Sequence, residues 1–367
     1  MKIVHTEASC GFGGQELRIL TEAKGLQDRG HDLSIICEAH SNIFKLADSY
    51  GLTAIPMPIE KKNRKGFWAL RSWIKQNQPD IINTHSSADT WMTALAVKTL
   101  VDRPAIIRTR HISAPIPQNL FSRWLYCRGS NFVVTTGEKL REVLVGVNGF
   151  PENHIKSIRT GVDLNRFKPA DKLKQRELLG IKSDVLTLGI VATLRSWKGH
   201  RYLLEAFSEL VDQFPVQLVI VGDGPTEKAL KEYAGQLGLN DSVFFAGRQE
   251  NVECWMQAMD VFCLPSYANE GVPQSLMQAQ ACGLPVITTA VGSIEEAVVK
   301  NKTALIVKPK DAGSLKIAIE QLLSNEKKRE DMSAQAKIFA HDNFSLGIML
   351  DEMEVLFDRF VEVKKNA

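Results

Sequence analysis

The chain has 367 residues, of which 44% are hydrophobic and 24% charged, and its formal net charge is +3. This length allows two domains with a large core, and the charge is too small to indicate nucleic-acid binding. None of the six cysteines forms a CxxC pair or a zinc spacing, so reduced thiols are expected. The sequence has no signal-peptide core, and no apolar run approaches the roughly 20 residues of a membrane span.

The first 150 residues alternate short apolar strands, each ending in polar residues, with amphipathic helices. Strands are predicted at residues 2–9, 31–38, 80–85, 105–111 and at the start of 130–146, and a helix within 11–30. Segment 151–172 breaks this alternation with Pro, Gly and polar residues, which indicates a linker. The alternation is typical of an open, mostly parallel α/β sheet.

The same alternation restarts after the linker. Strands are predicted at residues 185–194, 216–224, 242–247, 260–266 and 285–290, and helices at 199–214, 226–238, from 274 onward and at 351–365. Two successive doubly wound halves are therefore expected. Ligands of such sheets bind at the carboxyl ends of the strands, so we expect a cleft between two facing domains.

A glycine-rich loop, Gly11–Phe12–Gly13–Gly14, follows the first strand. Glycines allow close approach of the backbone to a ligand, and the next helix offers free N–H groups, which suits a phosphate. A tight strand-to-helix turn explains the same loop equally well. The spacing is not GxGxxG, and Glu38 at the end of the second strand is a weak substitute for the usual acid, which disfavours a dinucleotide site.

Two cations, Arg195 and Lys198, follow a strand of the second half. Together they suit a diphosphate, which arginine binds as a fork and lysine as a point charge. Two solvated surface cations are the alternative, and this is the commoner environment of both residue types.

One acid, Glu270, stands just before a helix that begins after Pro273 and carries Gln274 and Gln278. Proline fits the first helical turn, and the helix dipole favours a carboxylate there. A helix-start acid with a solvated polar face is therefore one interpretation. The other is that Glu270 and the two glutamines, which share a helix face, meet a ligand.

His111 ends a strand beside Arg108 and Arg110, and His85 has the same placement one strand earlier. A histidine at a strand end can bind a polar ligand or transfer a proton. A ring satisfied by nearby backbone is the alternative. No Asp-x-Asp pair and no cluster with metal-ligand spacing occurs, so nothing indicates a metal-dependent mechanism.

These features together resemble the retaining glycosyltransferases of family 4, which have the GT-B fold. The resemblance covers nearly the whole chain, in the order and spacing of about seven segments. They are GGQELRILTEAKGLQDRGHDLSII, PDIINTHSS, RTGVDLNRFKP, VATLRSWKG, VIVGDGP, FFAG and DVFCLPSYANEGVPQSLMQAQACGLPVITTAVGSIEEAV. The resemblance implies two Rossmann-like domains: an acceptor domain over residues 1–166, joined by a C-terminal helix at 346–367, and a donor domain over 167–345.

The resemblance also implies roles for residues. The donor would be a sugar nucleotide, a UDP-sugar before a GDP- or ADP-sugar, with no cofactor and no metal. Arg195 and Lys198 would neutralise the departing diphosphate. Glu270 would bind hydroxyls of the transferred sugar, and His111 would lie near the reacting centre. The other implied donor-binding residues are Gly13, Gly14, Gly222, Gly247, Arg248, Gly271, Val272, Gln274, Ser275 and Gln278.

Two positions depart from the family pattern. The family has glutamate at both ends of the motif that starts at Glu270, whereas Gln278 occupies the second end here. An amide still bonds a ribose diol but forgoes a charge-assisted hydrogen bond, a loss of roughly 1 kcal/mol. Pro273 replaces a common glycine and removes one backbone donor.

Two segments of the first half, residues 60–73 and 119–129, interleave basic with aromatic residues. This composition suits an anionic membrane surface or a phosphorylated glycolipid acceptor, with a solvated loop and a core helix as the alternative. The predicted acceptor or membrane contacts are Lys61, Lys62, Arg64, Lys65, Trp68, Arg108, Arg110 and Arg123.

We therefore expect a retaining, metal-independent enzyme that moves a sugar from a nucleotide-diphosphate donor to a glycan or glycolipid. Synthesis of bacterial lipopolysaccharide or another surface glycan would suit it, in the cytoplasm and at the inner face of the membrane. A nucleotide-sugar 2-epimerase of GT-B shape is one alternative, but it requires additional acids for proton abstraction. A non-catalytic sugar-nucleotide-binding module is another, and Gln278 is its only support.

Overall fold

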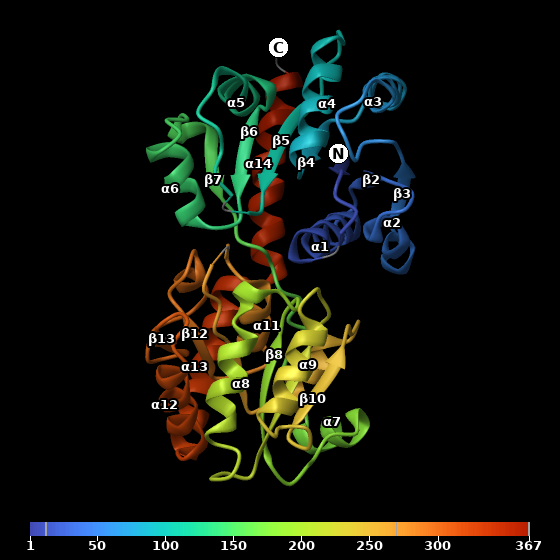
Figure 1. Cartoon of the computed structure of the whole chain (residues 1–367). Helices are drawn as coiled ribbons and strands as arrows, with labels where there is room; N and C mark the ends of the chain where they lie inside the picture. Colours follow the sequence, from blue (N-terminus) through green and yellow to red (C-terminus); the bar gives the residue numbers. More distant parts are fainter. Residues whose placement is uncertain (12, 113, 269, 366–367) are drawn as a thin grey trace. The chain divides into compact units, whose positions relative to one another are not determined.

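The computed structural model describes residues 1–11, 13–112, 114–268 and 270–365, with the side chains of 363–365 left out. The chain divides into two compact units (Figure 1). The first combines Met1–Gly161 with Leu346–Ala367, and the second is Val162–Ser345. This division falls five residues before the boundary expected from the sequence, because Val162 already donates a backbone hydrogen bond to Phe344 of the second unit.

The first unit is built on a parallel sheet with strand order β3-β2-β1-β4-β5-β6-β7. Its strands are β1 (Lys2–Glu7), β2 (Asp32–Cys37), β3 (Thr53–Pro56), β4 (Ile81–Thr84), β5 (Ala105–Arg110), β6 (Phe132–Thr135) and β7 (Ile155–Ser157). Its helices are α1 (Gly14–Asp28), α2 (Asn42–Ala47), α3 (Arg64–Asn77), α4 (Ser87–Lys98), α5 (Leu120–Trp124), the π-helical turn η2 (Leu125–Gly129), α6 (Glu138–Gly146) and α14 (Leu346–Lys365).

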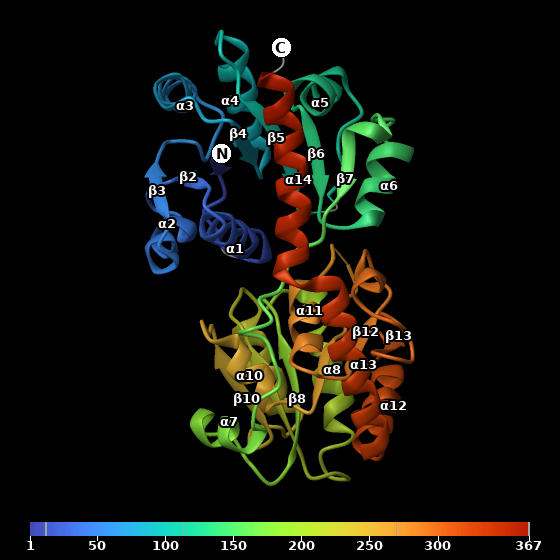
Figure 2. The same ribbon diagram turned by 180° about the vertical axis from the view of Figure 1, so that it is seen from behind.

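Helices cover both faces of this sheet, as both-sided burial of parallel strands requires. One core packs α1 and α14 against the sheet, and α14 runs along it in Figures 1 and 2. The other core packs α3 and α4 against the opposite face. The predicted helix at 351–365 is thus part of a longer one that begins at Leu346.

The second unit has a parallel sheet with strand order β10-β9-β8-β11-β12-β13. Its strands are β8 (Leu186–Val191), β9 (Val216–Val221), β10 (Val243–Gly247), β11 (Val261–Leu264), β12 (Val286–Thr289) and β13 (Ala304–Val307). Its helices are α7 (Lys172–Leu179), the short η4 (Ser196–Lys198), α8 (His200–Ser208), α9 (Glu227–Gln236), α10 (Val252–Ala258), α11 (Gln274–Ala281), α12 (Ala312–Leu323) and α13 (Glu326–Phe344).

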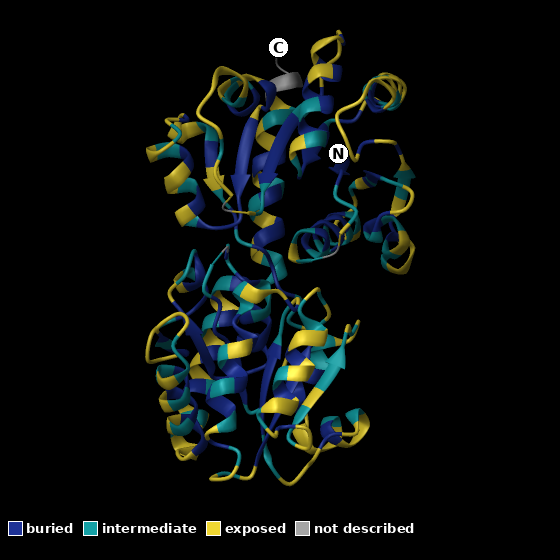
Figure 3. Cartoon of the chain, viewed as in Figure 1, coloured by how far each residue is buried: buried dark blue, intermediate teal, exposed yellow. Residues whose placement is uncertain are grey.

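Both sheets therefore contain the doubly wound order 3-2-1-4-5-6, to which the first sheet adds β7 at its edge, and this confirms the predicted α/β class. Strands β1 and β8 occupy equivalent places, and β4 and β11 lie beside them. The central strands are buried, the edge strands β3 and β10 are partly exposed, and the outer faces of the helices are exposed (Figure 3). In this topology ligands bind outside the carboxyl ends of the strands where the order reverses, at β1/β4 in the first unit and β8/β11 in the second.

Candidate functional site

The loop after β8 carries Arg195 and Lys198 and is held against the loop after β11. Gly199 makes this close approach possible. Its φ is +81°, and a Cβ there would lie 2.1 Å from the carbonyl oxygen of Pro265. The backbone N–H of Tyr267 also donates to the carbonyl of Trp197 at 2.8 Å. The two strand ends at the topological switch point are thus fixed to each other.

Lys198 and Glu270 meet at this point. The Lys198 Nζ atom lies 2.7 Å from Oε1 of Glu270, and their side chains are only 18% and 5% exposed. A Cβ on Gly292, whose φ is +61°, would lie 2.0 Å from the carbonyl oxygen of Glu270, so this glycine packs directly on the backbone of Glu270. The carboxylate is therefore a nearly buried, ion-paired and rigidly held group rather than a solvated helix-start acid.

Arg195 differs from Lys198 in its surroundings. Its side chain is exposed, and its guanidinium carbon lies 5.2 Å from the ring centroid of Trp197. Within the described ranges, Arg195 forms no salt bridge. Its donors are thus available to an anion at the same strand end that holds Lys198.

Helix α11 begins after Pro273, whose side chain gives no capping hydrogen bond. The first-turn N–H groups of Gln274 and Ser275 lie at the positive end of the helix dipole. The side-chain oxygen Oε1 of Gln274 is buried without a partner among the described residues. A ligand that donates a hydrogen bond would satisfy it.

The three glutamines of α11 do not form one solvated face. Gln278, one turn after Gln274, is 5% exposed, and Gln280 is fully buried. The Nε2 group of Gln280 donates to the carbonyl of Ala297, so this residue packs inside the unit. The interpretation of Gln274 and Gln278 as a solvated polar face therefore does not hold for Gln278.

Two further predicted donor-binding glycines join neighbouring strand ends. A Cβ on Gly222, at φ +136°, would lie 2.1 Å from the carbonyl oxygen of Ala192. The backbone N–H of Gly222 donates to the carbonyl of Gly247 at 2.8 Å. The carboxyl ends of β8, β9 and β10 are therefore contiguous, and Arg248 directly follows them. Gly271 and Val272 lie between Glu270 and α11, half-buried.

In the first unit, the predicted glycine loop precedes α1, with Gly13 as its N-cap and Gly14 as its first residue. Phe12 lies outside the described residues. Gly13 has an extended backbone, with φ −170°, that any residue adopts, and a Cβ there would make only an ordinary contact with Glu16. The backbone conformation at residue 13 therefore does not require glycine. Of the two interpretations of this loop, this favours the one in which glycine lets a ligand approach the backbone over the one in which it makes a tight turn.

Two acids that the sequence analysis did not single out face this loop. Glu7, at the end of β1, accepts from the backbone N–H of Ser9 at 2.6 Å and from the amide of Gln15. Glu16 accepts from the hydroxyl of Ser9 at 2.9 Å. Burial raises the pKa of Glu7 well above its usual range, and the nearby Asp89 carboxylate raises it further.

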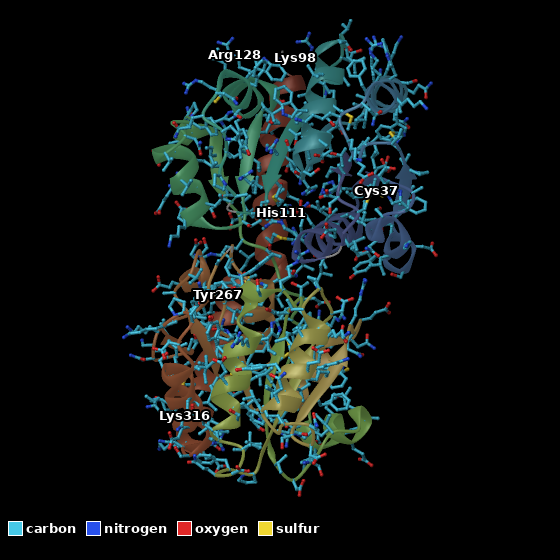
Figure 4. All side chains as sticks on the ribbon, viewed as in Figure 1. Cys37, Lys98, His111, Arg128, Tyr267 and Lys316 are labelled. Atoms are coloured by element: carbon cyan, nitrogen blue, oxygen red, sulfur yellow. The ribbon has the colours of Figure 1, made fainter. Side chains whose placement is uncertain are left out.

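Three histidines form a hydrogen-bonded chain across β1, β4 and β5. The distance from Nδ1 of His5 to Nε2 of His85 is 2.9 Å, and the distance from Nδ1 of His85 to Nε2 of His111 is also 2.9 Å. Figure 4 shows His111 beyond the carboxyl end of β5. Burial lowers the pKa of all three rings, well below the usual range for His85 and His111. All three are therefore neutral near pH 7.

The two basic and aromatic segments of the first unit adjoin each other. The ammonium of Lys62 lies 5.2 Å from the ring centroid of Trp91, and Trp91 stacks on Trp124 of α5 with centroids 5.5 Å apart. The exposed members of this surface are Lys61, Lys62, Arg64, Lys65, Trp68, Leu120, Phe121 and Arg123. We call these residues the basic–aromatic surface.

A cavity of about 530 Å³ lies beside the basic–aromatic surface. Leu120 and Phe121, which are 83% and 73% exposed, line it together with Arg123 and Phe150. Such exposed apolar side chains on a short helix need a covering partner to leave water. No helix over the described residues combines the length and apolar character that crossing a membrane requires.

Arg108 and Arg110 do not belong to this surface. Arg108 is 5% exposed, with its guanidinium carbon 4.4 Å from the ring centroid of Tyr126, and Arg110 donates to the hydroxyl of Tyr126 at 2.9 Å. The predicted membrane contact is therefore wrong for Arg108, because η2 covers it, whereas Arg110 is half-buried and its acceptor or membrane contact stays a prediction. Figure 4 also places Arg128 at the other end of the sheet from His111.

Comparisons with known proteins match both halves of the chain. Residues 171–339 match the family Glycosyl transferases group 1, and residues 12–166 match Glycosyltransferase Family 4. An uncharacterized glycosyltransferase of Haemophilus influenzae is 27% identical over 90% of this chain and 92% of its own length. The UDP-Gal:alpha-D-GlcNAc-diphosphoundecaprenol alpha-1,3-galactosyltransferase of Escherichia coli is 26% identical over 82% of each chain.

Among solved structures, Anabaena HepE in complex with UDP superposes with a TM-score of 0.86, at 21% identity and over 98% of this chain and all of its own. At this identity the likeness concerns the fold. It confirms the expected two-domain GT-B architecture.

Proposed function

The chain belongs to the group 1 glycosyltransferases, and we propose that it transfers a sugar from a nucleotide-diphosphate donor to a glycan or glycolipid, with retention and without a metal ion. The observation that carries this proposal is the buried ion pair of Lys198 with Glu270, beside the exposed Arg195. Each of the three groups has a separate task in the transfer.

Cleavage of the donor leaves a diphosphate that gains negative charge. Arg195 and Lys198 follow the end of β8, and the N–H groups of Gln274 and Ser275 lie at the start of α11. All of these groups are hydrogen-bond donors. Preorganised donors of this kind stabilise developing charge most where water is excluded. They supply the charge that a divalent cation supplies in other phosphate sites. Metal independence thus follows from the cations that the chain already holds.

Glu270 is suited to binding rather than to proton transfer. Its Oε1 accepts from Lys198, so this oxygen is already engaged in an ion pair and is not free to take a proton from the acceptor. The remaining oxygen can accept from hydroxyls of the donor sugar. We propose that an oxygen of the departing phosphate takes the proton of the acceptor hydroxyl on the same face of the sugar. The configuration is then retained without the second carboxylate that a covalent double displacement uses.

We propose that the histidine chain fixes His111 as a hydrogen-bond donor. Nε2 of His5 is buried without a partner among the described residues. An unsatisfied N–H is rarer in proteins than an unsatisfied lone pair, so the proton of His5 belongs on Nδ1. His5 then donates to His85 and His85 donates to His111. The proton of His111 is consequently on Nδ1, where it can donate to a hydroxyl near the reacting centre.

For the acceptor we propose a glycan carried by an anionic lipid at a membrane surface. The basic–aromatic surface combines five exposed cations with exposed Trp68, Leu120 and Phe121. Basic residues attract an anionic leaflet, and apolar side chains enter its headgroup region. The Escherichia coli relative is named for a diphosphoundecaprenol-linked acceptor, which supports this class and a role in surface-glycan synthesis. Contact with the inner face of the cytoplasmic membrane is part of the proposal.

For the donor we propose a UDP-sugar. The Escherichia coli relative is named for UDP-Gal, and the solved structure of HepE contains UDP. The test is a thermal-shift panel of UDP, GDP and ADP with their sugars, followed by donor hydrolysis and transfer assays in the presence of a chelator. Stabilisation by UDP and chelator-resistant transfer are expected.

Failure of every nucleotide to stabilise the protein would overturn the transferase proposal. Binding of a UDP-sugar without turnover would instead favour the non-catalytic module, and epimerised UDP-sugar would favour the 2-epimerase. A base preference other than uracil would overturn the donor assignment alone.

A further inference from the structure

Three potential metal ligands that are distant in sequence meet at the carboxyl edge of β1, β2 and β3. Cys10 follows β1, His40 follows β2, and Glu60 follows β3. One ligand atom from each lies within 4.8 Å of those of the other two, and Sγ of Cys10 is 3.2 Å from Nε2 of His40. Their separation in the chain explains why no ligand spacing was visible in the sequence.

The Cys10–His40 distance is close to what a tetrahedral zinc ion needs. With Zn–S of about 2.3 Å and Zn–N of about 2.0–2.1 Å, tetrahedral sulfur and nitrogen ligands lie roughly 3.6 Å apart. A shift of a few tenths of an ångström would reach this value. Cys10 is half-buried, while His40 and Glu60 are exposed, so an ion from solution can reach all three.

Glu38 supplies the support that a ligating histidine normally has. Its Oε2 atom lies 3.9 Å from Nδ1 of His40, and its Oε1 accepts from the backbone N–H of Glu60 at 2.8 Å. A carboxylate beside Nδ1 favours the tautomer that leaves the lone pair on Nε2, the atom that faces Cys10. Glu38 therefore holds the segment that carries Glu60, and a small shift would bring its other oxygen within hydrogen-bonding distance of Nδ1 of His40.

The local charge also favours a cation. The carboxylates of Glu38 and Glu60 both lie at this edge of the sheet, and their negative charge attracts a divalent cation. When zinc binds, the thiol proton leaves and the Zn–S bond replaces the S–H bond, without any change in oxidation state.

We propose that Cys10, His40 and Glu60 bind one Zn²⁺ ion, with Glu38 as the positioning residue of His40. A fourth position remains for water or another ligand, as in zinc sites with three protein ligands. Cys10 directly precedes the glycine loop that leads to Gly13 and Gly14, and its carbonyl already accepts from Asn42 at 3.1 Å. The ion links the start of this loop to the ends of β2 and β3. This proposal is independent of the transfer reaction.

The test is titration of the full-length, reduced protein with Co²⁺, followed by displacement with Zn²⁺. We expect one equivalent to bind with a near-ultraviolet thiolate-to-cobalt absorption band, which Zn²⁺ abolishes because it binds more tightly. Cys10→Ser should remove the band, and Glu38→Gln should weaken binding roughly 10- to 100-fold while keeping it. Cys127→Ser, a half-buried thiol elsewhere in the first unit, is the matched control.

Absence of the band, or a band that survives in Cys10→Ser, would overturn the proposal. Unchanged affinity in Glu38→Gln would overturn the positioning role alone. Because the readout is optical, the result does not depend on whether the transferase proposal holds. Circular dichroism of each variant separates a lost ligand from a lost fold.

Discussion

The two units share one strand order but carry opposite chemistry at the equivalent point. At the β8/β11 switch of the second unit, Lys198 and Glu270 form an ion pair at 2.7 Å. At the β1/β4 switch of the first unit, His5 and His85 are held uncharged by burial, and burial raises the pKa of Glu7. One topology therefore serves a charged binding site in one unit and a neutral hydrogen-bonding network in the other.

This difference separates two ways of making a buried polar site. An ion pair keeps a strong electrostatic field available for a charged ligand. Removal of one partner is strongly destabilising, because the other charge is left buried and unpaired. A neutral chain gives weaker individual interactions but fixes the direction of every hydrogen bond. The predictions below test each of these properties.

Removal of one charge from the second unit should have the largest effect. Lys198→Ala and Glu270→Ala should each lower kcat/KM of transfer by about 10²–10³-fold, because each loses a donor or sugar contact and leaves its partner buried and unpaired. Kinetic assays of both variants and of the double variant measure this. The double variant should lose less than the product of the single effects, because the residues are coupled.

Lys316→Ala is the control for charge removal, since Lys316 forms an ion pair with Glu209 at the surface of the same unit. It should leave transfer unchanged. Near-normal turnover of Lys198→Ala or Glu270→Ala with intact circular dichroism would show that the donor site lies elsewhere.

The second unit also contains a buried neutral histidine, His200. It tests whether uncharged buried groups contribute to stability in the second unit as well as in the first. Burial lowers the pKa of His200 to about 3, and Lys198 adds to this shift. The folded pKa lies below the unfolded value of about 6.5, so stability is present above pH 6.5 and is lost as pH falls toward 3. Between pH 6.5 and 4.5 the loss from this group is about 2 kcal/mol.

His200→Phe should remove that dependence, and denaturant unfolding at pH 7 and 4.5 measures it. The variant should lose less stability on acidification than the wild type does. His341→Asn, at an exposed position, should keep the wild-type slope. A His200→Phe slope equal to that of the wild type would contradict a neutral His200.

Interruption of the histidine chain should have a moderate effect. His85→Phe removes both hydrogen bonds and frees His111 to change tautomer, so we expect roughly a tenfold loss of kcat, equivalent to about 1.4 kcal/mol. Nitrogen NMR of the imidazoles should show the proton of His111 on Nδ1 in the wild type and a mixed state in the variant.

The control for this change is His31→Gln, since His31 bonds Glu354 in the same unit at 2.7 Å. It should leave both the turnover and the tautomer of His111 unaltered. A wild-type His111 protonated on Nε2 would reverse the proposed direction of the chain.

The smallest effect is expected at Gln278. Gln278→Glu restores an acid that can form a charge-assisted bond to a diol, worth about 1 kcal/mol, so UDP should bind about fivefold more tightly. Isothermal titration calorimetry measures this, with Gln213→Glu as an exposed control of equal charge in the same unit. Weaker binding would mean that the burial of residue 278 outweighs the new bond.

The second unit could be largely predicted from the sequence because its candidate site is local. Arg195 and Lys198 lie in one loop, and Glu270, Gln274 and Gln278 lie in one loop and helix. Periodicity and turn residues suffice to place such segments at strand ends. What the sequence could not show was that Gly199 allows the first loop to pack on Pro265, or that Gly292 packs on the backbone of Glu270.

The first unit was less predictable because its polar groups converge from distant strands. His5, His85 and His111 are neighbours only because β1, β4 and β5 are adjacent in the sheet. The order of strands in a sheet cannot be predicted from local sequence patterns. Arg108 was misplaced for a related reason. From the sequence, an arginine at a strand end is expected to be a surface cation. Only the structure shows that η2, which carries Tyr126, covers Arg108.

The return of α14 to the first unit has a consequence for the order of synthesis. Leu350 fills the space beside Gly25, where a Cβ would lie 2.5 Å from it, and Met353 and Phe357 are fully buried in the core that α14 shares with α1. A ribosome must therefore translate the entire second unit before this core can close. The second unit, which is continuous in sequence, can fold first, while the nascent first unit exposes an apolar groove that chaperones can recognise.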